Sequence, residues 1–159
     1  MNAAVYPGSF DPPTLGHINI IERASSIFDH LHIVIAVNLE KNNFFSPNEK
    51  FKIIKDLVKP FPNVELHLWD KLIVDFAKEN NIKVMIRGVR ALADFSYEFE
   101  LAMTNKSLYP EIEIIFMPTD PKYFVLRSSA IKEIARFGGD ISSMVPPSVA
   151  EAIKSKLGK

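Results

Sequence analysis

The feature that most constrains the fold is an alternation of short apolar runs with longer segments of helical periodicity. The apolar runs have the length of strands, and runs such as residues 31–37 are β-branched without a polar face, which is typical of strands buried on both sides. Strands are predicted at residues 3–6, 31–37, 64–69, 84–86 and 112–117. Helices are predicted at residues 17–28, 46–58, 72–79, 94–108, 128–137 and 147–157.

This order predicts an α/β fold, a doubly wound parallel five-stranded sheet with helices on both faces. We expect residues 1–159 to form one domain, a common size for such a unit. In such sheets, ligands bind beyond the carboxyl ends of the strands, where the strand order reverses. Functional residues are therefore expected in the segments that follow strands.

Composition excludes several classes of protein. Nineteen basic and nineteen acidic residues give no net charge, which argues against broad nucleic-acid binding. The absence of cysteine rules out disulfides, thiolate metal sites and a cysteine nucleophile. The apolar runs are shorter than the ~20 residues of a membrane helix, and the first residues do not resemble a signal peptide. We therefore expect a cytoplasmic protein with no membrane partner.

The segment after the first predicted strand reads YPGSFDPPTLGH and ends at His17. Gly8 and Gly16 allow a close approach of the backbone to a ligand, and a helix N-terminus favours phosphate. His17 falls on the first helical turn. The segment is either a phosphate site or a Gly/Pro turn with a histidine that caps the helix.

Three later segments also follow strands. Residues 38–45 carry Lys41, which is either a phosphate ligand or a solvated side chain. Arg87 and Arg90 flank a glycine and can grip phosphate, although such pairs also occur in ordinary turns. Ser128 or Ser129 is expected to be the N-cap of a helix, as an anion site or as a plain cap.

The helix predicted at residues 94–108 has two distinct stripes. The mostly polar stripe is either solvated surface or one wall of a cleft, and it comprises Asp94, Glu98, Leu101 and Asn105. The apolar stripe is expected to be core, and it comprises Phe95, Phe99, Ala102 and Met103.

No spacing in the sequence is typical of metal ligands. His30, His32 and His67 are scattered along strands and are expected to be structural.

Together these segments resemble the phosphopantetheine adenylyltransferases, nucleotidyltransferases with a (T/H)-x-G-H motif. The resemblance covers nearly the whole chain and rests on GSFDP, TLGH, Lys41, IRGVR, DFSYE and SSAIKE, in that order. It implies a Rossmann-like fold and transfer of the adenylyl group of ATP to 4′-phosphopantetheine, which gives dephospho-coenzyme A and pyrophosphate. It further implies a homohexamer, Mg²⁺ held mainly by phosphate oxygens, and coenzyme A as a feedback ligand.

The resemblance also assigns roles to individual residues. The implied catalytic residues are His17, Lys41 and Arg90. The implied contacts to phosphopantetheine are Ser9, Lys41, Ile73, Arg87, Leu101 and Asn105. The implied contacts to ATP are Ser9, Phe10, His17, Gly88, Val89, Arg90, Asp94, Glu98, Tyr123, Phe124, Val125, Leu126, Arg127, Ser128 and Ser129.

One departure and two alternatives accompany this interpretation. Arg127 stands where many members carry serine, next to the expected triphosphate. A nicotinate mononucleotide adenylyltransferase shares the GSFDPP segment, but it usually has histidine at the position of Thr14 and lacks the RGVR block. The intact His17, Lys41 and Arg90 argue against a nucleotide sensor that has lost catalysis.

Overall fold

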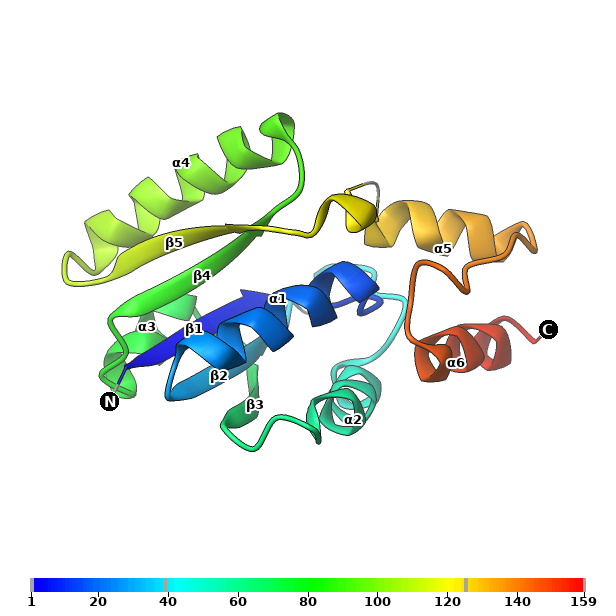
Figure 1. Cartoon of the computed structure of the whole chain (residues 1–159), viewed down its shortest axis with the longest axis horizontal. Helices are drawn as coiled ribbons and strands as arrows, with labels where there is room; N and C mark the ends of the chain where they lie inside the picture. Colours follow the sequence, from blue (N-terminus) through cyan, green and yellow to red (C-terminus); the bar gives the residue numbers. More distant parts are fainter. Residues whose placement is uncertain (1, 39, 125, 159) are drawn as a thin grey trace.

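The computed structural model describes residues 2–38, 40–124 and 126–158, and these form a five-stranded parallel sheet (Figure 1). The strands are β1 (Ala3–Gly8), β2 (His30–Ala36), β3 (Val64–Trp69), β4 (Val84–Val89) and β5 (Glu113–Pro118). Their order in the sheet is β3-β2-β1-β4-β5. The chain moves outward from β1 to one side and then returns to β4 on the other, so the strand order reverses between these two strands. The predicted fold class is confirmed.

Helices cover both faces of the sheet and extend beyond one end. They are α1 (Leu15–Ile27), α2 (Pro47–Val58), α3 (Ile73–Glu79), α4 (Leu92–Leu108), α5 (Ser128–Arg136) and α6 (Pro147–Leu157), with a 3₁₀ turn at Pro121–Tyr123. Helices α1 and α2 pack on one face, and α3 packs on the other. Helix α4 lies along β4 and β5, while α5 and α6 lie past the carboxyl ends of the strands (Figure 1).

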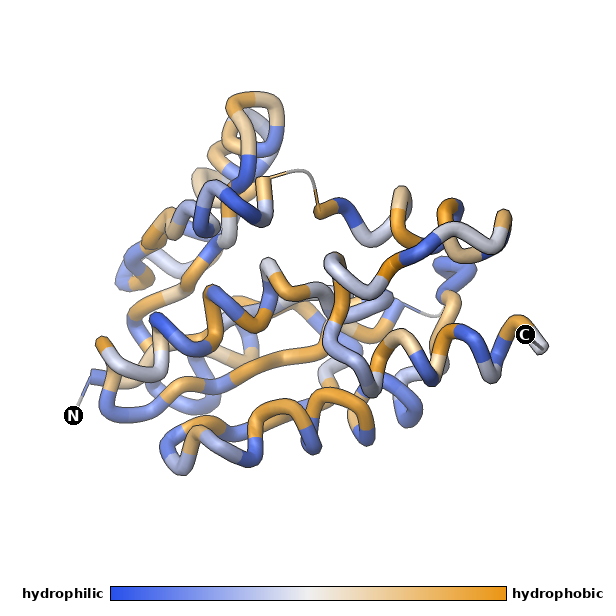
Figure 2. The backbone as a smooth tube through the Cα atoms, turned by 45° about the vertical axis from the view of Figure 1, so that its right-hand side comes forward, coloured by the Kyte–Doolittle hydropathy of each residue, from blue (hydrophilic) through white to orange (hydrophobic). Residues whose placement is uncertain are grey.

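The core lies on both faces of the central strands. In β2, Leu31, Ile33 and Ile35 are buried against α1 and α2, whereas Val34 faces α3 together with Met85. This alternation follows from the two-residue period of a strand. Burying each such side chain contributes about 1.5–3 kcal/mol. Figure 2 shows the resulting hydrophobic stretches along the strands between the helices.

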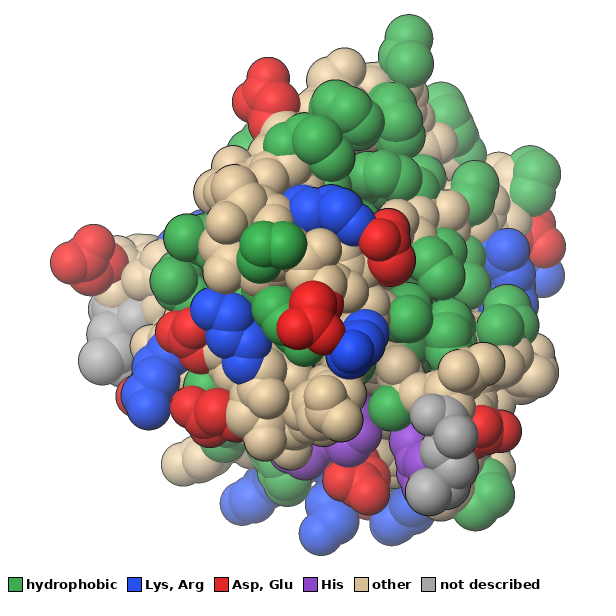
Figure 3. Space-filling model, turned by 90° about the vertical axis from the view of Figure 1, so that its left-hand side faces the viewer, with side chains coloured by type: hydrophobic (Ala, Val, Ile, Leu, Met, Phe, Trp, Pro, Cys, Tyr) green, Lys and Arg blue, Asp and Glu red, His purple; other side chains and the backbone are tan. Residues whose placement is uncertain are grey.

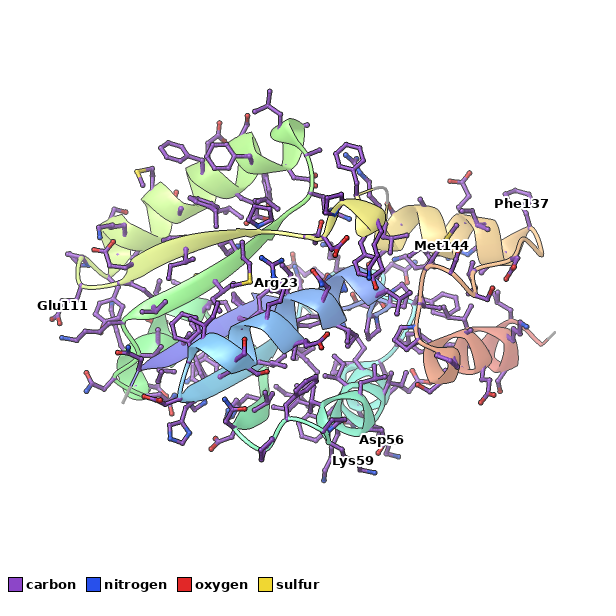
Figure 4. All side chains as sticks on the ribbon, viewed as in Figure 1. Arg23, Asp56, Lys59, Glu111, Phe137 and Met144 are labelled. Carbon is purple, nitrogen blue, oxygen red and sulfur yellow. The ribbon has the colours of Figure 1, made fainter. Side chains whose placement is uncertain are left out.

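Polar contacts fix α1 against the segments around it. The Arg23 guanidinium, which Figure 4 labels between α1 and β5, donates to the Pro118 carbonyl at 2.6 Å. At the other end of the helix, the Leu15 N–H donates to the carbonyl of Met144 at 3.0 Å. The start of α1 is therefore tied to the C-terminal segment, which holds α5 and α6 near the carboxyl ends of the strands.

Strand β4 is longer than the sequence indicates. It was expected to end at residue 86, but Arg87, Gly88 and Val89 continue the ladder by pairing with β5. Arg87 therefore projects from a rigid strand rather than from a loop.

The apolar stripe of α4 is not core, and that prediction is wrong. Phe95, Phe99 and Met103 are 38%, 45% and 48% exposed, and of the stripe only Ala102 is buried. The polar stripe faces the sheet instead, because Asp94 and Glu98 pair with arginines of β4 and the loop after it. Figure 3 shows the hydrophobic side chains that gather at the top of the molecule, where α4 and β5 lie.

Two of the strand histidines, His32 and His67, are not scattered. His32 Nδ1 lies 3.1 Å from Nε2 of His67, because the two strands are neighbours in the sheet.

None of the helices in the described ranges combines the length and the apolar character required to cross a bilayer.

Candidate active site

A cavity of about 420 Å³ opens at the carboxyl ends of β1 and β4, the point where the strand order reverses. Four parts of the chain line it: the segment from β1 into α1, the end of β4 with α4, the residue after β5, and the segment that leads into α5. The described lining residues are Tyr6, Pro7, Gly8, Ser9, Thr14, Gly16, His17, Ile20, Arg87, Gly88, Arg90, Glu98, Thr119, Leu126, Arg127, Ser128 and Ser129. This position is the one predicted for a ligand in such a sheet.

His17 closes the N-terminus of α1 and also faces the cavity. The His17 N–H donates to Thr14 Oγ1 at 3.2 Å, and the Thr14 N–H donates to His17 Nδ1 at 3.0 Å. This reciprocal pair is a capping box in which histidine takes the position usually held by Glu or Gln. Because Nδ1 accepts a hydrogen bond, the ring proton resides on Nε2, which is left as a donor.

The imidazole of His17 is neutral near pH 7. Burial, and secondarily the positive charge of Arg90, lowers its pKa to about 4. A neutral ring whose one N–H is fixed by the capping box stabilises an anion by hydrogen bonding rather than by a full charge.

Carboxylates of α4 hold the arginines of the site in place. Arg87 Nε donates to Glu98 Oε2, and Arg90 Nε donates to Asp94 Oδ2 at 3.1 Å. Arg90 also donates to the Leu126 carbonyl, and Arg127 Nη2 lies 3.7 Å from Asp94 Oδ1. The described lining residues thus include three arginines and one glutamate, which favours an anionic ligand.

Gly88 lets the floor of the cavity pack closely. A Cβ at this position would lie 3.3 Å from Tyr6 Oη and 3.6 Å from Cγ1 of Ile20. Tyr6 is buried, and burial raises the pKa of its hydroxyl, so it stays protonated beside Arg87 and Arg90.

The carboxylate of Asp11, which the sequence reading did not single out, joins three segments around the site. It accepts hydrogen bonds from the backbone N–H groups of Phe44 and Phe45, both at 2.8 Å, and lies 3.3 Å from Lys132 Nζ of α5. It is 5% exposed. Asp11 thereby connects the loop after β1, the loop that carries Lys41, and α5.

A buried lysine also contacts the loop after β1. Lys50 of α2 is fully buried, and its Nζ donates to the carbonyl of Ser9 at 3.0 Å. Burial lowers the pKa of Lys50, and the charge of Asp11 opposes that shift. In the sequence, Lys50 stands at helical spacing with Ile54 and Val58, on the stripe of the helix that is otherwise apolar. That position is the signal that could have revealed this contact.

The structure brings most of the predicted site residues together. Those lining the cavity are Ser9, His17, Arg87, Gly88, Arg90, Glu98, Leu126, Arg127, Ser128 and Ser129. Phe10 lies beneath it, buried in a left-handed conformation (φ 47°), with its ring 5.0 Å from that of His17. Asp94 contributes indirectly through its ion pair with Arg90.

The remaining predicted residues lie outside that lining. Lys41 is on an exposed loop, and Ile73, Leu101 and Asn105 are half-buried on α3 and α4. Val89 is buried, Tyr123 packs with the cluster around α5 and α6, and Phe124 is exposed. Val125 falls outside the described residues.

The prediction that Ser128 or Ser129 is the N-cap of α5 is wrong. The N-cap is Arg127, which makes no capping side-chain bond, and the helix begins at Ser128. Ser128 Oγ donates instead to the Pro12 carbonyl at 3.0 Å, which ties α5 to the loop after β1.

Sequence comparisons match the chain to a family model and to full-length relatives. The cytidylyltransferase-like family model matches residues 5–134. A phosphopantetheine adenylyltransferase of Clostridium tetani is 52% identical over 156 residues, which cover 98% of each chain. One from Caldanaerobacter subterraneus subsp. tengcongensis is 46% identical over 159 residues, covering 100% of this chain and 99% of that one.

A solved structure supports the fold alone. A Vibrio parahaemolyticus protein provisionally named a nicotinate-nucleotide adenylyltransferase superposes with a TM-score of 0.71 at 20% identity, over 99% of this chain and 95% of that one. Because full-length relatives are about half identical and the family model matches most of its length, the chain belongs to the phosphopantetheine adenylyltransferase family of cytidylyltransferase-like proteins.

Proposed function

We propose that this protein transfers the adenylyl group of ATP to 4′-phosphopantetheine, which releases pyrophosphate and gives dephospho-coenzyme A. The observation that carries the proposal is the cavity at the β1–β4 reversal, where His17, Arg87 and Arg90 converge beside the N-termini of α1 and α5. It occurs in a chain half identical to phosphopantetheine adenylyltransferases over its full length.

The reaction needs positioning and charge stabilisation more than proton transfer. A phosphate oxygen of the acceptor is already anionic at neutral pH, so it attacks the α-phosphorus directly. The new P–O bond forms as the bond to the β-phosphate bridging oxygen breaks, and the pair of electrons leaves with pyrophosphate. In the transition state His17 Nε2–H donates to an α-phosphate oxygen, while Arg90 and the first turn of α5 hold the other phosphates.

We assign the acceptor side to residues on five segments: the loops after β1 and β2, strand β4, and helices α3 and α4. Ser9, Lys41 and Arg87 bind the phosphate of phosphopantetheine, and the pantetheine arm runs along the surface formed by Ile73, Leu101 and Asn105. The support is that Ser9 and Arg87 line the cavity. The loop that carries Lys41 is anchored to the loop after β1 through Asp11.

Mg²⁺ fits this site as a companion of ATP. The carboxylates nearest the cavity, Asp94 and Glu98, are engaged by arginines, so triphosphate oxygens provide most of the ligands. When bound, the ion neutralises charge that builds up on the departing pyrophosphate. Arg90 and Arg127 then hold the remaining phosphate oxygens.

We further propose that the protein is a cytoplasmic homohexamer and that coenzyme A binds as a feedback ligand in the same cavity. The exposed apolar surface of α4 and β5 supports self-association. It includes Phe95, Phe99, Met103 and Ile115, which are 38–48% exposed. Phe99→Glu is expected to lower the mass measured by light scattering, and an unchanged hexamer would exclude α4 from the contact.

Pyrophosphate release tests the reaction. Purified protein with ATP and Mg²⁺ is given 4′-phosphopantetheine or nicotinate mononucleotide in parallel. We expect release with the first acceptor and none above background with the second. Binding of ATP without transfer to either acceptor would refute the proposal in favour of a nucleotide sensor.

A further inference from the structure

Two histidines and a glutamate meet on the outer strands of the sheet, away from the cavity. Position 32 of β2 pairs with position 65 of β3, and position 67 lies on the same face, two residues further along. His32 Nδ1 lies 3.1 Å from His67 Nε2, and Glu65 Oε2 lies 3.7 Å from each of these nitrogens. Figure 3 shows histidine side chains beside an acidic one at the lower edge of the molecule.

The spacing of these three atoms matches a tetrahedral zinc site. Ligand atoms bound to Zn²⁺ at about 2.0–2.2 Å lie about 3.3–3.6 Å from one another. The observed separations of 3.1, 3.7 and 3.7 Å differ from that spacing by only a few tenths of an ångström. Since the side chains come from paired strands, the backbone already brings them together on one face of the sheet.

The surroundings also suit a metal ion. Burial lowers the pKa of both His32 and His67, so both rings are neutral near pH 7 and each has a lone pair available. His32 Nδ1 and His67 Nε2 face each other, so only one of these two nitrogens carries a proton. A metal ion can replace that proton and bind both nitrogens. The Phe76 ring covers one side, with its centre 4.9 Å from that of His67, while Glu65 is 61% exposed and leaves a path for the ion.

We propose that His32, Glu65 and His67 bind one Zn²⁺, or a divalent transition ion of similar chemistry, with water in the fourth position. None of the three is among the described residues that line the cavity, so the ion is structural rather than catalytic. It links β3, the edge strand of the sheet, to β2. Imidazole ligands favour such an ion over Mg²⁺, which prefers oxygen ligands.

Titration of untagged, EDTA-stripped protein tests the proposal. Calorimetry is expected to show saturable binding of one Zn²⁺ ion per chain, and excess Mg²⁺ should not displace that ion. Co²⁺ is expected to give the intense visible bands of four-coordinate cobalt. At free Zn²⁺ a hundred times the dissociation constant, the folding equilibrium constant measured in urea should rise about 100-fold.

Variants separate this site from general binding at histidines. His67→Gln and Glu65→Gln should each weaken Zn²⁺ binding at least tenfold. His30→Gln is the control, because His30 lies on β2 with His32 but outside the cluster, and it should leave Zn²⁺ binding unchanged. Glu65→Gln alters an exposed side chain, so it remains informative if His67→Gln does not fold. Adenylyl transfer with Mg²⁺ should be normal in Glu65→Gln. The absence of saturable binding, or equal affinity in wild type and Glu65→Gln, would overturn the proposal.

Discussion

Replacing His17 by glutamine should remove one component of the pH dependence of stability while preserving the start of α1. Glutamine is an ordinary N3 residue of a capping box, so it can still accept from the Thr14 N–H. It does not titrate. The variant is therefore a matched control for the proton that the imidazole takes up.

The magnitude follows from the pKa of His17, which is 6.5 in an unfolded chain and about 4 in the folded protein. The unfolded chain binds the proton more readily between these values, so acid favours unfolding. The contribution of the neutral His17 imidazole to the free energy of unfolding is fully present above about pH 6.5 and is lost as the pH falls towards 4. At about 1.4 kcal/mol per pKa unit, and allowing for partial exposure of the ring, the loss is about 2–3 kcal/mol.

Urea unfolding of both proteins from pH 7.5 to pH 4.5 measures this difference. The free energy of unfolding of the wild type should fall more steeply than that of His17→Gln, by up to about 2–3 kcal/mol over the window. His32 and His67 titrate in both proteins, so their contributions cancel. Parallel curves would show that His17 is not held neutral, and the hydrogen-bonding role given to its ring would then be refuted.

Three further substitutions test other parts of the site. Asp11→Ala should lower the free energy of unfolding by about 3–5 kcal/mol, because it leaves two backbone N–H groups and a lysine without their acceptor, while Asp11→Asn should cost less. Equal urea midpoints for Asp11→Ala and wild type would contradict this. Lys41→Ala should raise KM for 4′-phosphopantetheine about tenfold and leave the dissociation constant of ATP unchanged, measured by steady-state kinetics and calorimetry. Gly88→Ala should cost about 1–3 kcal/mol in thermal unfolding, and adding Tyr6→Phe should recover part of it; no recovery would show that the hydroxyl is not the obstacle.

The strands and helices could be predicted because each depends on a local pattern, and the place of the cavity follows from the order of these elements. The capping box at Ser46 and Glu49 appears in the structure as expected, with bonds of 3.2 and 2.7 Å. The segments after β1 and β4 meet because parallel strands place their carboxyl ends at one edge. Most of the candidate site follows from that rule.

The errors share a physical cause, because each depends on which segments meet in space. The stripe of Phe95 and Phe99 has the periodicity of a core helix, and only the attraction of Glu98 to Arg87 reveals that it faces outward. The reach of Asp11 to Lys132 spans 121 positions. Local periodicity carries no information about such pairs.

The double use of His17 has a consequence for ligand affinity. Freezing a free side chain on binding typically costs about 0.5–1.5 kcal/mol. The capping box at the start of α1 already fixes the orientation and the tautomer of the His17 ring. The entropy of ordering the ring is therefore lost once, on folding, and not each time a ligand binds. An incoming nucleotide meets a donor whose direction is set before it arrives.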